Sequence, residues 1–468
     1  MADTLEMTPA ATARLRVPHF IRGTYETGED AVYRSRDLGG EFTTPALRLD
    51  RLIWPRSEPG PAFDTPIAEI VDLLVELGQR LAFDSNIYLQ EAAAMSAKAS
   101  PLGQRIVENT YMDIPRIFDR SALMADMEIV GAAALDGWQA SERGGHHHVR
   151  AFPSRMVHVV AGNSPMVSGL TIARGALSKG VHLIKLPSND LFTATAILRT
   201  LADIDKDHPV VRSFSAAYWP GGDERVESGI YRAQYFDKVV AWGGEASMRH
   251  IQKYIGPGLE LISFDPKTSM SLIGKEAFAS EETLKAVAWR ASADVKVCNQ
   301  DACVASRFQF IEGSVEDADR YCGHLLEALG EDSRYGDGQG PLPTAELRDH
   351  VEGVSMLEPM YRVFGRPDGR GMVIRSQAPV DFHPSDKTVN VVAVDNLRQG
   401  VLRANVATQT VGVYPNSRKA EFRDALASAG VQRVVPLGEA MESSLGRPHD
   451  AFYPLHRFVR WVADEGED

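Results

Sequence analysis

The chain has 468 residues, of which 44% are hydrophobic and 24% are charged, and its formal net charge is −13. Its length predicts two or three folded domains, and its acidic balance excludes nucleic acids and anionic lipids as expected partners, because like charges repel. No apolar run is long enough to span a bilayer, and three cysteines are too few for a disulfide framework, so we expect a cytoplasmic protein.

The N-terminal part of the sequence is irregular. Residues 1–65 have weak periodicity, begin without the apolar core of a secretory signal and end in a proline-rich stretch, so they are predicted to form an arm and a linker. From Pro66 onward, apolar residues recur every three or four positions, which predicts an amphipathic helix, and two more helical stretches follow within residues 86–121. Residues 127–155 are predicted to form a hairpin of two extended runs around a Gly-containing turn.

Beyond residue 155, short apolar runs alternate with stretches of helical length. Strands separated by such helices predict a parallel, doubly wound sheet. Residues 66–126 and 156–270 are predicted to form one such domain, and residues 271–445 a second. Residues 446–468 are predicted to contain a helix that packs on the second domain. The predicted fold class is therefore α/β, with two doubly wound domains and a small hairpin.

Two segments of the first domain suggest a nucleotide site. Gly243 and Gly244 separate an apolar strand from a helix, and such a turn lets a phosphate approach backbone N–H groups at the positive end of the helix dipole. Lys185 lies at the carboxyl end of another predicted strand, the edge at which open parallel sheets bind ligands. Each signal has an ordinary alternative, namely a tight turn for the glycines and a solvated side chain for the lysine.

The stretch Cys298–Ser306 holds two of the three cysteines between two runs that are both predicted as strands. One cysteine pair without a second pair or a nearby histidine does not build a four-coordinate site, so no metal is predicted. At the histidine tract 146–148, a hairpin turn is favoured over a metal site. Cys303 is a reasonable nucleophile where a helix start, a cation or a donor stabilises its thiolate, and otherwise an inert small residue.

Six motifs occur in a characteristic order along the chain. They are AGNSPMVSG at 161–169, HLIKLPS at 182–188, VVAWGGEAS at 239–247, SFDPKTS at 263–269, NQDACVAS at 299–306 and DKTVNVVAVDNL at 386–397. Their order and spacing resemble the aldehyde dehydrogenase superfamily, and within it the acyl-CoA reductases of the bacterial bioluminescence fatty-acid reductase type. The resemblance runs from about residue 150 to the C-terminus, and more loosely over the preceding helices.

The resemblance implies a role for each motif residue. Cys303 matches the thiol nucleophile, and Asn163 matches the asparagine that donates its amide to a developing oxyanion. Lys185 matches the lysine on the adenosine ribose. Gly243 and Gly244, in the turn that leads to Ser247, match the glycine-rich turn below the pyrophosphate. Cys298 matches no functional position and is expected to pack.

The resemblance also implies what each part of the chain does. Residues 66–126 and 156–270 would form the dinucleotide-binding domain, and residues 271–445 the catalytic thiol domain. Residues 127–155 match the oligomerisation hairpin of the superfamily, and an exposed hairpin edge invites pairing with another subunit, so a homodimer or homotetramer is expected.

Two departures from the family pattern concern water and the cofactor. Ser263 stands where hydrolytic members carry a glutamate that activates water, so CoA rather than water is expected to enter and leave; Asp265 is too displaced to be favoured as a substitute. Ser188 stands where NAD-preferring members often carry a carboxylate, which favours NADPH over NADH. His449 and Asp450 form either an acid–base pair or, as favoured here, the cap of the C-terminal helix.

These residues together predict NADPH-dependent reduction of an acyl-CoA, expected to be a fatty acyl-CoA, to an aldehyde through an acyl-cysteine. Three alternatives stay open. One is an acylating dehydrogenase that acts on an aromatic or short-chain aldehyde and CoA. Another is an acyl-carrying subunit that is loaded by a transferase or synthetase partner and has little redox activity alone. The third is a nucleotide sensor, against which the nucleophile Cys303 and its donor Asn163 argue.

Overall fold

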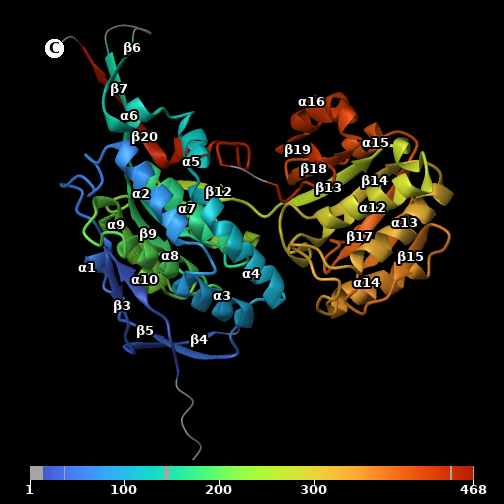
Figure 1. Cartoon of the computed structure of the whole chain (residues 1–468), viewed down its shortest axis with the longest axis horizontal. Coiled ribbons are helices and arrows are strands. Elements are labelled where there is room, and N and C mark those ends of the chain that lie inside the picture. The colour runs from blue at the N-terminus through green and yellow to red at the C-terminus, as the bar shows by residue number, and fades with distance from the viewer. Residues whose placement is uncertain (1–13, 36, 142–146, 443–444, 467–468) are drawn as a thin grey trace, which may run out of the picture.

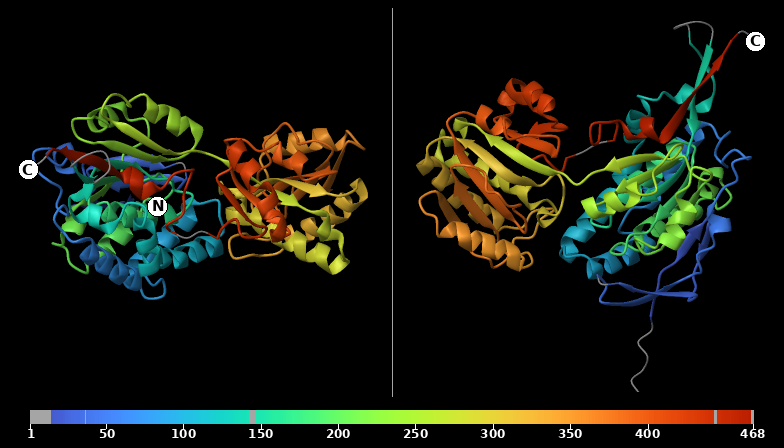
Figure 2. Two further views of the ribbon diagram at one scale, coloured as in Figure 1. Left: turned by 90° about the horizontal axis from the view of Figure 1, so that it is seen from above. Right: turned by 180° about the vertical axis from the view of Figure 1, so that it is seen from behind.

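The computed structural model describes residues 14–35, 37–141, 147–442 and 445–466, which form two lobes side by side (Figure 1). Each lobe contains a seven-stranded mixed sheet. Two three-stranded sheets complete the architecture, one in the N-terminal arm and one that projects from the N-terminal lobe (Figure 2). Within these residues, no helix is both long enough and apolar enough to cross a membrane.

The sheet of the N-terminal lobe has a parallel centre, as the alternating pattern predicts. Its order is β12 (Glu260–Phe264), β11 (Lys238–Trp242), β8 (Arg155–Val159), β9 (Val181–Lys185), β10 (Phe214–Ala217), β2 (His19–Ile21) and β3 (Thr24–Glu26). The first five strands are parallel, whereas β2 pairs antiparallel with β10, and β3 pairs antiparallel with β2.

The N-terminal arm is therefore more ordered than its sequence indicates. All three residues of β2 are buried, and the arm also forms a sheet of its own from β1 (Leu15–Arg16), β5 (Gly40–Thr44) and β4 (Ala31–Ser35). A strand of three residues is too short to show a period in the sequence, and its pairing partner β10 lies almost two hundred residues away. The order of this segment is set by tertiary contacts.

Helices cover the sheet of the N-terminal lobe. They are α1 (Leu49–Leu52), α2 (Ile67–Arg80), α3 (Ile87–Ala99), α4 (Gln104–Asp113), α5 (Arg120–Met127), α7 (Met166–Leu177), α8 (Thr193–Ala202), α9 (Pro209–Arg212), α10 (Glu224–Ile230) and α11 (Glu245–Gln252), with the 3-10 turn η1 (Ile114–Phe118) after α4. Ile67, Ile70, Leu74 and Leu77 of α2 are buried at helical spacing, as predicted.

The sheet of the C-terminal lobe is parallel except at one edge. Its order is β15 (Tyr361–Gly365), β16 (Met372–Ser376), β17 (Thr388–Val394), β14 (Ser306–Glu312), β13 (Thr268–Ile273), β18 (Thr408–Tyr414) and β19 (Arg433–Pro436). Only β15 is antiparallel to its neighbour. The helices of this lobe are α12 (Glu281–Lys296), α13 (Val315–Leu329), α14 (Ala345–Ser355), α15 (Arg398–Val401) and α16 (Lys419–Ala429).

The projecting sheet corrects two predictions. Its order is β20 (Val459–Glu465), β7 (His147–Pro153) and β6 (Gln139–Ser141), all antiparallel (Figures 1 and 2). The first predicted extended run is wrong over α6 (Ala132–Asp136), because an Ala-rich turn favours helix. The predicted C-terminal helix is only the short α17 (Pro454–Phe458), which packs against α7 of the N-terminal lobe rather than on the second domain, and the chain then pairs with β7. The predicted Gly-containing turn and His146 lie outside the described residues.

Candidate active site

A cavity of about 1200 Å³ between the two lobes brings the predicted site residues together. Its walls come from the carboxyl ends of β8, β9, β11 and β12 in one lobe and from the loop before β14 in the other. All seven predicted residues line it: Asn163, Lys185, Ser188, Gly243, Gly244, Ser247 and Cys303. The residues predicted to bind a nucleotide and the predicted thiol nucleophile thus line one cavity.

Cys303 lies on a loop rather than directly after a strand. Helix α12 continues to Lys296, a 3-10 turn η3 (Val297–Gln300) follows, and β14 begins only at Ser306. The prediction of a strand before Cys298 is therefore wrong. Alternating apolar residues near the end of α12 resemble the pattern of a strand. They belong to a helix that begins after Ser280, whose side chain caps it by accepting a bond from the Thr283 N–H.

The loop around the thiol is held by hydrogen bonds from the sheet. The Ser269 hydroxyl donates to the Cys303 carbonyl at 2.8 Å and accepts from the Thr410 N–H at 3.1 Å. The thiol itself is half-buried. Burial raises its pKa, the Asp450 carboxylate adds to this effect, and a hydrogen bond with the Gln409 side chain opposes it. At neutral pH the thiol is therefore mainly protonated and must lose a proton before it attacks.

The other cysteine of this stretch has different surroundings. Cys298 is 6% exposed, and burial raises the pKa of its thiol to about 12. A thiol with such a pKa is a poor nucleophile at neutral pH. Its environment agrees with the packing role expected for Cys298.

Asn163 follows β8 and precedes α7, in a turn that packs closely on Asn189. A Cβ atom at Gly162 would lie 1.9 Å from Oδ1 of Asn189, so a larger residue there requires the Asn189 side chain to move. The Asn163 side chain is exposed and lines the same cavity as Cys303. An exposed amide that faces the thiol cavity is free to donate to a ligand oxygen.

The nucleotide side of the cavity has room beside the glycine turn. Gly243 and Gly244 connect β11 to α11; a Cβ at Gly243 would lie 3.3 Å from that of Ser247, whereas one at Gly244 would meet open space. Lys185 ends β9 and is 8% exposed. Burial lowers the pKa of its ammonium group to about 8, and the Glu227 carboxylate partly offsets this change. These groups fit a dinucleotide phosphate and ribose.

Ser188 has a carboxylate neighbour that the sequence does not reveal. Its hydroxyl donates to Oδ2 of Asp37 at 3.1 Å. Asp37 lies in the N-terminal arm, 151 residues earlier in the chain, so only the folded arm brings it to this site. The negative charge that Ser188 itself lacks is thereby partly restored, which weakens the expected preference for NADPH.

The C-terminal residues His449 and Asp450 line the cavity and do not cap a helix. They lie in a turn closed by backbone bonds between His449 and Phe452, and the N-cap of α17 is Tyr453. The predicted cap is therefore wrong. Asp450 accepts a bond from Gln409 at 3.0 Å, and its side chain is 5% exposed. Burial raises the pKa of this carboxyl. Of the two alternatives taken from the sequence, only the acid–base pair would have placed these residues in the cavity.

Stacked rings form the floor of the cavity near these residues. Trp242 and Phe264 stack with their ring centroids 3.7 Å apart, and His449 meets both rings edge-on at 5.1 Å. Burial lowers the pKa of His449 to about 3, so its imidazole is neutral. Residues 264–268 line the cavity, whereas Ser263 is not among the described residues that line it. No described group of three His, Cys, Asp or Glu side chains lies close enough to hold a metal ion.

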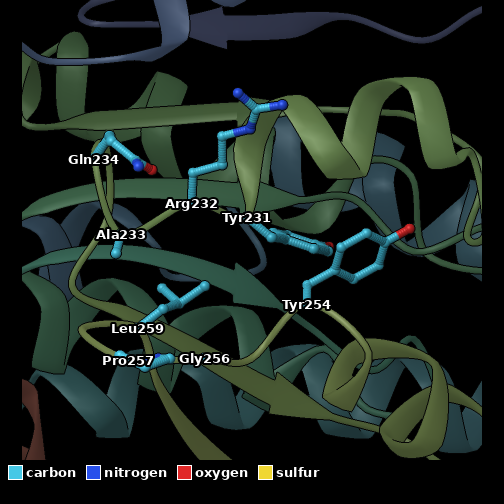
Figure 3. Close-up of a pocket in the computed structure, with 8 residues that line it drawn as sticks. All are labelled: Tyr231, Arg232, Ala233, Gln234, Tyr254, Gly256, Pro257 and Leu259. Atoms are coloured by element: carbon cyan, nitrogen blue, oxygen red, sulfur yellow. The ribbon is translucent and has the colours of Figure 1, made fainter.

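A second hollow of about 330 Å³ opens on the N-terminal lobe (Figure 3). Tyr231 and Tyr254 meet edge-on in its wall, and Arg232 points away from them. It shares no lining residue with the cavity between the lobes. It holds none of the predicted site residues and is not the candidate active site.

Comparison with known proteins identifies relatives over most of the chain. The family model described as acyl-CoA reductase (LuxC) matches residues 62–461. The long-chain acyl-protein thioester reductase of Vibrio harveyi is 29% identical over 420 residues, which are 86% of this chain and 83% of that protein. The protein of the same name from Photorhabdus luminescens is 31% identical over 345 residues, which are 71% of this chain and 67% of that protein.

Solved structures with low sequence identity share the fold. An NAD-dependent benzaldehyde dehydrogenase from Corynebacterium glutamicum aligns with a TM-score of 0.70 at 15% identity, over 96% of this chain and 97% of that chain. An NADP-dependent glyceraldehyde-3-phosphate dehydrogenase from Bacillus halodurans C-125, complexed with NADP, aligns with a TM-score of 0.70 at 12% identity, over 97% of this chain and 99% of that chain. The predicted aldehyde-dehydrogenase-like α/β fold is confirmed.

The family match spans residues 62–461, far more than half of the chain, and includes every motif on which the resemblance was based. The chain therefore belongs to the acyl-CoA reductase (LuxC) family and is an acyl reductase, a member of the oxidoreductases.

Proposed function

We propose that this protein reduces a fatty acyl thioester to an aldehyde with NADPH, through an acyl group carried on Cys303. The observation that carries the proposal is the single cavity that contains Cys303, Asn163, Lys185 and the Gly243–Gly244 turn. In this proposal, the N-terminal lobe binds the dinucleotide and the C-terminal lobe presents the thiol.

The acylation step uses groups of this chain alone. The Cys303 thiol loses its proton, and the thiolate attacks the carbonyl carbon of the thioester. Asn163 and the backbone N–H of Cys303 donate to the oxygen on which negative charge develops; one such donor contributes about 3–4 kcal/mol. The leaving thiolate departs and takes up a proton, so the acyl group remains on Cys303.

The second step regenerates the thiol. NADPH, when bound, supplies a hydride. The Gly243–Gly244 turn and Lys185 hold the phosphates and ribose, and the same donors stabilise the second oxyanion on the Cys303 adduct. Collapse of this thiohemiacetal releases the aldehyde and the Cys303 thiolate, which is then protonated. Because Ser263 replaces the glutamate of hydrolytic relatives, no side chain at that position helps water to intercept the acyl group.

The acyl donor is proposed to be acyl-CoA or a protein-bound thioester. The family description supports CoA, whereas the names of the relatives from Vibrio harveyi and Photorhabdus luminescens support an acyl protein. An acyl-transferring partner is therefore part of the proposal. The mechanism at Cys303 is the same for both donors, because both are thioesters.

Assembly and location are proposed from the rest of the molecule. The projecting sheet has β20 and β6 at its edges. Trp461 in β20 is 42% exposed and Trp138, just before β6, is 41% exposed, which suits a homodimer or homotetramer. The three cysteines are unpaired, which supports a reducing cytoplasm.

The acyl-enzyme can be tested directly. Mixing the protein with a long-chain acyl-CoA in the absence of NADPH is expected to add one acyl mass to the peptide that contains residues 299–306. Because burial and Asp450 raise the pKa of Cys303, the acylation rate is expected to rise as the pH increases above neutrality. Intact-protein and peptide mass spectrometry measure both results. Full turnover without an acyl mass on this peptide would refute the proposed function.

The cofactor preference is expected to depend on Asp37. A 2′-phosphate near Ser188 is repelled by the Asp37 carboxylate, so Asp37→Asn should raise kcat/KM for NADPH relative to NADH by roughly two- to fivefold, as for an exposed charge pair. The ratio is measured with one thioester and both cofactors. Asp50→Asn, an exposed carboxylate elsewhere in the first fifty residues, is the control and should leave it unchanged. An unchanged ratio in Asp37→Asn would place the 2′-phosphate away from this carboxylate.

A further inference from the structure

The turn that precedes the nucleophile has an unusual backbone. Cys298, Asn299 and Gln300 are consecutive and none is glycine, yet their φ angles are +49°, +50° and +74°. Side chains with a Cβ atom disfavour this left-handed region, so a run of three persists only where surrounding contacts hold it. Cys303 follows three residues later, so the conformation of this turn sets where the thiol and its backbone N–H point.

One segment outside the turn holds two of the three residues. The Cys298 N–H donates to the Tyr335 carbonyl at 2.8 Å. The Asn299 side chain makes two bonds with Asp337: its amide donates to the carboxylate at 3.2 Å and its oxygen accepts from the Asp337 N–H at 2.9 Å. Gln300 is held within its own lobe, by bonds from its amide to the carbonyls of Ser306 and Thr388. Residues 332–338 thus form a clasp on the turn.

The same clasp is bound to helix α4 of the other lobe. Arg105 donates to the Asp337 carboxylate at 2.8 Å and to the Gly336 carbonyl at 2.9 Å, and it also bonds to the Ser333 carbonyl. Asn109 donates to the Arg334 carbonyl at 2.8 Å.

The end of α4 adds a further contact. Asp113 accepts bonds from the Arg334 guanidinium at 2.7 Å and from the Tyr335 hydroxyl. Asp113 is 6% exposed and lines the cavity together with Tyr335. The clasp therefore touches the cofactor lobe, the substrate cavity and the turn before the nucleophile at once.

We propose that the clasp, residues 332–338, couples the docking of the two lobes to the geometry of the nucleophile, with Asp337 and Asn299 as positioning residues for Cys303. The Asp337 carboxylate bridges Arg105 of one lobe and Asn299 of the thiol loop. When α4 is docked, the clasp holds the left-handed turn and the thiol lies in the cavity that Asn163 also lines. When α4 separates, the clasp keeps its bonds to Lys387 within its own lobe but loses those to Arg105, and the turn before Cys303 becomes less constrained. The proposal rests on the function proposed for Cys303.

The test measures thiol reactivity and turnover separately. Asn299→Ala and Arg105→Ala are each expected to slow the alkylation of Cys303 by iodoacetamide about tenfold and to lower kcat by about the same factor, since small displacements of reacting atoms carry such costs. KM for NADPH should change by less than about threefold. Because both variants act through Asp337, the double variant should also lose only about tenfold, rather than the hundredfold of independent effects.

The controls separate positioning from general damage. Arg80→Ala removes an exposed arginine of the same lobe that bonds to the Glu76 carboxylate and the Asp203 carbonyl, both outside the clasp, and it should change neither rate. Asp337→Asn keeps an acceptor for Asn299 and provides a milder variant if an alanine variant does not fold. The proposed role of the clasp would be refuted if Asn299→Ala and Arg105→Ala left the alkylation rate unchanged, or if their separate losses in rate multiplied in the double variant. Alkylation of Cys303 does not depend on turnover, so it tests the clasp separately from the proposed function. The proposed function would be refuted by a different result, namely thioester reduction that survives in Cys303→Ala.

Discussion

Replacement of Cys303 by alanine is expected to remove both the acyl-enzyme and NADPH consumption. The proposed mechanism places the acyl chain on this thiol, and loss of a nucleophile of this kind costs at least about 10³-fold in kcat. The residual activity should lie below detection with any thioester in a chain-length series. Acyl incorporation and NADPH oxidation measure the two effects.

Cys298→Ala is the matched control for that variant. Cys298 is five residues away and lies in the same cavity wall, but its burial raises its pKa to about 12. Its removal is expected to leave both signals within about threefold, as for a buried small residue that takes no part in the reaction. Equal losses in the two variants would show that the nucleophile is misassigned.

The long α/β elements could be predicted from the sequence because their signals are local. Helix α2 repeats apolar residues at helical spacing, and β9 and β11 are apolar runs of strand length between helices. Elements whose order depends on a distant partner could not be predicted. The strand β2 has three residues and forms only against β10, and β20 forms only against β7. For such segments the pairing energy comes from the fold and not from local propensity.

The site shows the same division between local and tertiary information. Asn163, Lys185 and the glycine turn lie in motifs at the carboxyl ends of strands, where parallel sheets gather ligand-binding residues. Cys303 was placed by its motif alone, because it lies on the loop before β14. Asp37 was missed because it arrives from the N-terminal arm to meet Ser188, and no spacing rule connects the two.

Asp450 was misread for a related reason. A histidine and an aspartate before a proline-containing helix look like a cap, but the turn at 449–452 directs the pair into the cavity. This placement affects the thiol, because burial and then the Asp450 carboxylate raise the pKa of Cys303 and favour the neutral form. A resting enzyme with a protonated nucleophile is less open to oxidation than one with a thiolate.

Replacement of Asn163 by alanine is expected to lower kcat by about 10²–10³-fold, the usual cost of one lost oxyanion donor. KM for the thioester should change little, because the donor acts on charge that develops only in the transition state. Steady-state kinetics with a long-chain acyl-CoA measure kcat and KM separately.

Alkylation of Cys303 by iodoacetamide provides the decisive comparison for this variant. That reaction displaces iodide from a CH₂ group and places no new charge on a carbonyl oxygen, so Asn163→Ala should alkylate at a rate within about threefold of the parent protein. If the alkylation rate falls by the same factor as kcat, Asn163 positions the Cys303 thiol and does not act by donating to the oxyanion. If neither rate falls, the oxyanion is held by other groups. Only a large loss in kcat with an intact thiol reactivity fits a side chain that donates to the reacting oxygen.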